Sequence, residues 1–141
     1  MSYRWILLPL FVEVALTLGL IIWLALLRRA DLLTGAAIPE HIALREPNWP
    51  VRTRQVANAF SNQFELPVLF YLITVLAMIT QHADYVFVAL AWIFALSRLI
   101  HAYIHTTSNV VLRRGAWYGV GLIALMLMWA IFMVRILFGF S

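Results

Sequence analysis

Hydrophobic residues run along the chain in four long blocks, each bounded by polar or proline-containing segments. The pattern predicts helices at about residues 5–27, 51–81, 85–105 and 116–140. As a helix the first block would be about 35 Å long, enough to cross the hydrocarbon core of a bilayer with some tilt. The chain is therefore predicted to be an all-α integral membrane protein, with a single four-helix transmembrane bundle formed by residues 1–141.

Charged residues and prolines set the expected ends and bends of these helices. Arg28 and Arg29 are expected to end the first helix. In the segment that follows, Pro39 and Pro50 prevent any long helix, so this segment is expected to be a loop. The second helix has a polar first half and an apolar second half. Pro67, near its middle, is expected to kink it without ending it.

Composition supports the membrane assignment. Of the 141 residues, 65% are hydrophobic and only 11% are charged, whereas a soluble domain carries roughly twice that share of charge. The absence of cysteine excludes disulfides, thiolate nucleophiles and cysteine metal sites in this chain. All ten basic residues are arginines, scattered singly or in pairs, a pattern that does not indicate a nucleic-acid-binding surface.

The distribution of arginines predicts an orientation. The first and third loops, with the residues beside them, carry seven arginines: Arg28, Arg29, Arg45, Arg52, Arg54, Arg113 and Arg114. The opposite face has only Arg4 and Arg135. By the positive-inside rule, both long loops face the cytoplasm and both termini lie on the non-cytoplasmic side.

Two sets of polar residues within the predicted membrane helices require partners. Each set has helical spacing, so each lies on one helical face. The sets are Asn58, Asn62 and Glu65 in the second helix, and Arg98, His101 and His105 in the third. These helices are antiparallel neighbours joined by a short turn, and both sets lie far from that turn. We expect the two faces to meet near the cytoplasmic end.

This polar meeting point has several interpretations. A Glu65–Arg98 ion pair is geometrically reasonable and could be purely structural, but the number of buried polar groups also suggests a pocket for a polar ligand. His101 and His105 could share a metal ion, yet no suitable third ligand is evident, so no metal site is predicted. Glu13, inside the first helix, is expected to pair with an arginine of another helix or another chain.

Two stretches resemble the signatures of a known family. Residues 58–70 (NAFSNQFELPVLF) and 97–105 (SRLIHAYIH) resemble the second-helix and third-helix signatures of the MAPEG superfamily, the membrane-associated proteins in eicosanoid and glutathione metabolism. The chain length, the four-helix plan and the long first loop also agree. The overall pattern looks like the bacterial members of this family, which implies a bacterial inner-membrane location.

The resemblance implies a homotrimer that binds glutathione between adjacent subunits, near the cytoplasmic face. By motif position the glutathione-contacting residues are Asn62, Glu65, Arg98 and His101, with His105 where relatives often carry a tyrosine. Arg114 matches the arginine thought to activate the thiol in the prostaglandin E synthase branch, and Arg113 is the alternative. Asn58 and Ser61 stand where eicosanoid-branch members tend to carry arginines that grip glutathione carboxylates.

Two functional hypotheses follow. The first is a glutathione-dependent transferase or peroxidase whose lipophilic electrophile arrives from the bilayer. In it, an arginine near the cofactor thiol favours the thiolate. The second is a non-catalytic membrane protein that binds a lipid or a partner helix. The departures at Asn58 and Ser61 motivate the second hypothesis, and the sequence alone leaves open whether the protein is an enzyme.

Overall fold

The computed structural model describes residues 1–43 and 48–140, and within them every regular element is an α-helix. The helices are α1 (Tyr3–Thr34), α2 (Pro39–Ile42), α3 (Val51–Asn62), α4 (Leu66–Ile79), α5 (Tyr85–Thr106) and α6 (Val111–Phe138). Together α3 and α4 form one of four spans long and apolar enough to cross a membrane. The prediction of an all-helical integral membrane protein with four such helices is confirmed.

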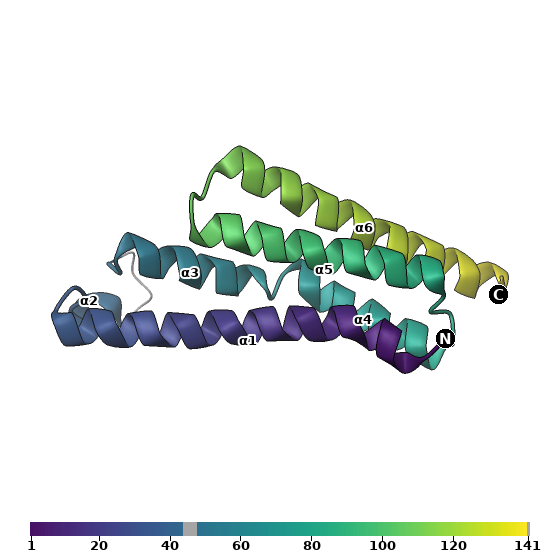
Figure 1. Cartoon of the computed structure of the whole chain (residues 1–141), viewed down its shortest axis with the longest axis horizontal. Coiled ribbons are helices and arrows are strands. Elements are labelled where there is room, and N and C mark those ends of the chain that lie inside the picture. Colours follow the sequence, from purple (N-terminus) through teal and green to yellow (C-terminus); the bar gives the residue numbers. More distant parts are fainter. Residues whose placement is uncertain (44–47, 141) are drawn as a thin grey trace.

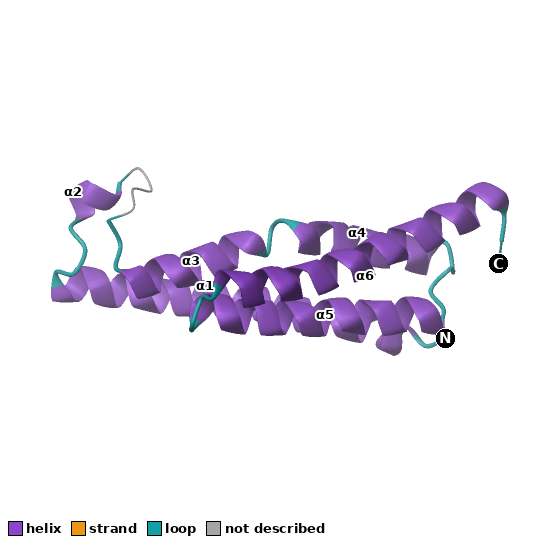
Figure 2. Cartoon of the chain, turned by 90° about the horizontal axis from the view of Figure 1, so that it is seen from above, coloured by secondary structure: helices purple, strands orange, loops and turns teal. Residues whose placement is uncertain are grey.

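The four spans lie lengthwise along one another (Figure 1). Both termini lie at one end of the bundle, while the loop around α2 and the α5–α6 connection lie towards the other end. Figure 2 shows the short α2 standing off the end of the bundle. The arginine-based orientation relative to the cytoplasm stays a prediction, and Arg45, which contributes to it, lies outside the described residues.

Two predicted helix ends were wrong. α1 continues past Arg28 and Arg29 to Thr34 and ends at Gly35, whose φ of 76° is left-handed and whose N–H bonds to the Leu32 carbonyl. α6 begins at Val111 instead of near residue 116. Arginine is a good helix former, so a run of arginines ends the membrane-embedded stretch without ending the helix.

The second span is broken, where the sequence analysis expected one helix kinked at Pro67. α3 ends at Asn62, and the N–H groups of Gln63, Phe64 and Glu65 bond to carbonyls three residues earlier. α4 then starts at Leu66, which places Pro67 in its first turn, where a proline's missing N–H costs nothing. The proline therefore begins a new helix after a tight break.

Two apolar clusters stabilise the bundle, one on each side of this break. The cluster towards the termini includes Phe70 and Phe94, whose rings stack with centroids 4.5 Å apart. The other cluster joins α1, α3 and α5 and consists of Leu20, Leu24, Val56, Ala59 and Ala102. Between the two clusters in sequence lie buried or half-buried polar residues of all three spans: Glu13, Asn62, Gln63, Arg98 and His101. The bundle therefore has a polar layer between two apolar cores.

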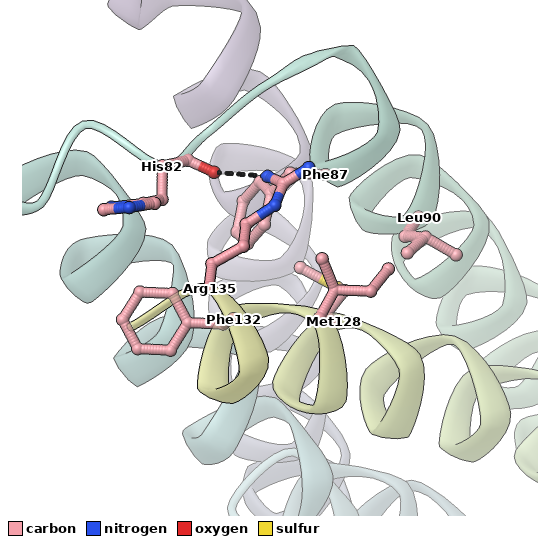
Figure 3. Close-up of a pocket in the computed structure, with 7 residues that line it drawn as sticks. His82, Phe87, Leu90, Met128, Phe132 and Arg135 are labelled. Carbon is pink, nitrogen blue, oxygen red and sulfur yellow. Dashed lines mark hydrogen bonds between the residues drawn. The ribbon is translucent and has the colours of Figure 1, made fainter. Parts of the chain in front are cut away.

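A polar clasp closes the end of the bundle that holds the termini. The Arg135 side chain of α6 donates to the His82 carbonyl at 3.3 Å (Figure 3). It also donates to Asp84 Oδ2 at 2.5 Å. Asp84 Oδ1 also accepts the Phe87 N–H, which caps the start of α5. Partial burial alone would raise the pKa of Asp84, but the bonds from Arg135 and Phe87 outweigh it and lower that pKa below its usual value. The turn before α5 is thereby fixed to α6.

Candidate functional site

A chain of hydrogen bonds joins the break after α3 to α5 and α6. Arg98 Nη2 donates to Asn62 Oδ1 at 3.0 Å, and also reaches the Asn62 carbonyl at 3.4 Å. Asn62 Nδ2 lies 3.0 Å from His101 Nε2. His101 Nδ1 in turn lies 3.0 Å from the Arg114 carbonyl oxygen. The sequence analysis predicted that the faces of the second and third helices would meet, and Asn62, Arg98 and His101 do so.

The chemistry of these contacts fixes the tautomer of His101. The Arg114 carbonyl can only accept, so the His101 Nδ1 must carry a proton. Arg98 can only donate, so it bonds the Asn62 oxygen and leaves the Asn62 amide nitrogen to face His101. That nitrogen donates to Nε2, and His101 is therefore a neutral imidazole protonated on Nδ1. Each hydrogen bond in the series from Arg98 to α6 is then donated in the same direction, towards α6.

The two adjacent arginines of α6 occupy different environments. Arg114 is half-buried, its Nη1 donates to Asn109 Oδ1 at 2.5 Å, and its charge acts on His105. Asn109 has a φ of 51°, a left-handed conformation that asparagine tolerates better than most residues. Arg113 is exposed. The fold thus holds Arg114 beside the histidines and leaves Arg113 at the surface.

Tyr118 and Gly121 complete the α6 side of the site, and the sequence analysis missed both. The Tyr118 ring lies 5.7 Å from the Arg98 guanidinium and 5.6 Å from the His101 ring. A Cβ on Gly121 would lie only 2.6 Å from Ser97 Oγ, so the glycine permits α6 to approach α5 closely. Their spacing of four and seven residues after Arg114 places them on the same face of α6, a signal that could have identified them.

The predicted Glu65–Arg98 ion pair is not formed. In the described part of the chain, the ion pair found is Asp84–Arg135. Glu65 is exposed because the tight turn after Asn62 interrupts the helical repeat that the sequence analysis carried through it. Its charge still acts on Arg98, without direct contact. Asn58 is also exposed, so the predicted three-residue stripe does not face α5 as a unit.

His105 is buried beside His101, with the two rings 5.6 Å apart and nearly perpendicular. Its Nδ1 is buried without a hydrogen-bond partner among the described residues. Residues 1–43 and 48–140 contain no group of three or more histidine, cysteine or acidic side chains that could hold a metal. The described site consists of guanidinium, amide, imidazole and phenol groups, which suit the recognition of an anionic, hydrogen-bonding ligand.

The polar layer also contains buried groups that lack partners. Glu13 of α1 and Arg98 are each 0% exposed, and Gln63, in the break, is 1% exposed. Both carboxylate oxygens of Glu13, both amide atoms of Gln63, and Arg98 Nε and Nη1 have no hydrogen-bond partner in the described residues. Glu13 was expected to pair with an arginine of another helix or another chain. Among the described residues Glu13 forms no ion pair, and Arg98 of α5 is the charged group that acts on it.

A groove of about 580 Å³ opens beside α3, between α1 and the loop after α2. Its polar lining consists of Arg28, Trp49, Arg54, Asn58 and Ser61. The Arg28 guanidinium stacks over the Trp49 ring at 5.2 Å. The sequence analysis noted Asn58 and Ser61 as departures from the arginines of related proteins. The groove places two other arginines beside them.

Comparison with known proteins identifies a family. The model described as the MAPEG family matches residues 6–134, which cover most or all of each of the four spans. A search of curated proteins and a search of solved structures each found no match.

Proposed function

Because the chain belongs to the MAPEG family, which includes glutathione-dependent transferases and peroxidases, we propose that it is a membrane-embedded enzyme of this kind. Its substrate would be a lipophilic electrophile that enters from the bilayer. The observation that carries the proposal is the hydrogen-bonded chain from Arg98 through Asn62 and His101 to the Arg114 carbonyl. This series of hydrogen bonds brings together four residues that the family motifs assign to glutathione binding and thiol activation.

The charges of glutathione match the groups around this chain. The tripeptide carries one ammonium and two carboxylates, and a carboxylate binds best to guanidinium donors. Glu65 is exposed and suits the ammonium, while Arg98 supplies positive charge and His105 Nδ1 has no hydrogen-bond partner among the described residues. MAPEG proteins are commonly trimeric, and a trimer would place the exposed residues of α3 against a neighbouring subunit. We take Asn62, Glu65, Arg98, His101 and His105 as the cofactor-binding set.

The carboxylates of glutathione also need anchors where Asn58 and Ser61 replace arginines. Arg28 and Arg54 line the same groove as these two residues, and Arg28 Nε is buried without a partner in the described chain. Each guanidinium offers a planar pair of donors that fits a carboxylate. Arg28 and Arg54 are therefore proposed to supply the charge that positions 58 and 61 lack.

Arg114 is the proposed thiol-activating residue. An adjacent guanidinium stabilises a thiolate over a thiol and so lowers the cost of forming the nucleophile. Arg114 is held by Asn109 and lies near both histidines, whereas Arg113 is exposed. The protein would contribute charge stabilisation and proximity, while bound glutathione supplies the sulfur that attacks the electrophile.

Calorimetry with glutathione on the detergent-purified protein tests the proposal. We expect saturable binding that Arg98→Ala and Glu65→Ala abolish and Arg54→Ala weakens, with Arg4→Ala as the control for loss of a distant positive charge. No binding at millimolar glutathione would overturn the proposal. Lipid that co-purifies in fixed proportion and is lost in Arg28→Ala would then support the alternative, a non-catalytic lipid-binding protein.

A further inference from the structure

The interior of the bundle contains a buried carboxylate, Glu13, that the proposed reaction does not use. Glu13 lies in the first half of α1, and along that helix it falls between Ile6 of one apolar cluster and Leu20 of the other. Arg98 lies between Phe94 and Ala102 of the same two clusters on α5. The two charges are therefore at the same level of the bundle, enclosed by apolar side chains on either side.

The two charges are each other's principal electrostatic partners. Arg98 is the charged group that acts on Glu13, and Glu13 is the first among the charges that act on Arg98, ahead of Glu65. Among the described residues no direct ion pair joins them, and both Glu13 oxygens together with Arg98 Nε and Nη1 are unpartnered. Arg98 uses only Nη2, on Asn62.

Polar atoms buried this deeply are almost always hydrogen-bonded. A fully buried carboxylate with free acceptors and a fully buried guanidinium with free donors, at one level of the bundle, match the sites that ordered internal water occupies in proteins. The unpartnered Gln63 amide, next to Asn62 in the break, adds two donors and one acceptor group to this level of the bundle. The interior thus offers both hydrogen-bond donors and hydrogen-bond acceptors to a small ligand.

We infer that the middle of the bundle is an internal water site in which the Glu13 carboxylate, through bridging water, is the counter-ion and positioning residue for Arg98. Arginine remains protonated in proteins, so a buried arginine needs an anion close by. With Glu13 balancing its charge, Arg98 is held with Nη2 towards Asn62. The carboxylate therefore acts on the Asn62–His101 contact through Arg98, and it does not contact the proposed cofactor.

Infrared difference spectroscopy on the intact protein in detergent at mildly alkaline pH tests this inference. Wild type minus Glu13→Gln is expected to show the band of an ionised carboxylate. Arg98→Lys keeps a cation and should preserve that band, whereas Arg98→Met should convert it to the carbonyl band of a protonated acid. Glu40→Gln, which removes an exposed carboxylate of α2, is the matched control. The carboxylate band assigned to Glu40 by this variant should be the same with and without Arg98→Met.

The results separate a counter-ion from a merely buried acid. A protonated Glu13 in the wild type, or an ionised Glu13 that persists in Arg98→Met, would overturn the inference. If Arg98→Met does not fold, the wild-type spectrum and the Arg98→Lys spectrum still decide it. Glu13→Asp should retain the carboxylate band and recover most of the thermal stability lost in Glu13→Gln. None of these readouts involves glutathione, so their failure is distinguishable from failure of the proposed function.

Discussion

The close approach of α6 to α5 at Gly121 makes a quantitative prediction. A Cβ added at this position would lie 2.6 Å from Ser97 Oγ, a separation that real Cβ atoms essentially never show. Ser97 is 1% exposed and donates from that oxygen to the Phe94 carbonyl at 2.7 Å. In Gly121→Ala, therefore, either the serine hydroxyl turns away from its acceptor or α6 retreats from α5.

These two responses set the range of stability that Gly121→Ala is expected to lose. Loss of one buried hydrogen bond costs about 1 kcal/mol, and overpacking that displaces a helix costs about 1–3 kcal/mol. The substitution also gains about 1 kcal/mol of helix propensity from replacing glycine. Gly119→Ala gains the same propensity with no atom within 4 Å of its Cβ, so it isolates the packing effect. We expect Gly121→Ala to be about 1–3 kcal/mol less stable than Gly119→Ala.

Thermal unfolding in detergent measures this difference, and a double mutant identifies its cause. Ser97→Ala removes the atom that the new methyl group meets, so Gly121→Ala combined with Ser97→Ala should recover most of the difference. Retreat of α6 would also move Tyr118 and the Arg114 carbonyl away from His101, so glutathione affinity should fall with stability. Equal stability of the two glycine variants, or no recovery in the double mutant, would refute the packing argument.

Two further predictions concern the clasp and the proposed catalytic arginine. Asp84→Asn should lower stability by about 0.5–1 kcal/mol at neutral pH, since it weakens a partly exposed ion pair and a helix cap. Because the pKa of Asp84 is lowered in the folded state, this contribution is present above the unfolded pKa of about 3.9 and is lost as pH falls through the folded pKa. The difference in unfolding temperature between wild type and Asp84→Asn should shrink as pH is lowered from neutral to acidic. A difference that stays constant with pH would contradict this prediction. Arg114→Ala should lower kcat about a hundredfold with a smaller effect on glutathione binding, as expected for loss of one group that stabilises developing charge. Steady-state kinetics check this, and a comparable loss in Arg113→Ala but not in Arg114→Ala would exchange the two roles.

The sequence by itself determined the class of the protein and part of its buried polar cluster. Hydrophobicity over about 20 residues sets membrane insertion locally, so the four spans could be recognised without their packing. Helical spacing also indicated that Asn62, Arg98 and His101 would share a meeting point, because residues three and four apart lie on one face.

The tertiary structure decided which of the candidate groups touch. The break at residues 63–65 rests on carbonyl bonds three residues back, and it turns Glu65 outwards, away from the ion pair its spacing suggested. Whether Arg113 or Arg114 lies at the surface depends on the rotation of α6 about its own axis, and Gly121 lies where α6 approaches Ser97 of α5 closely. Gln63 and Glu13 are buried only because neighbouring helices cover them. Periodicity fixes which residues share a face of a helix, whereas packing between helices fixes where that face points.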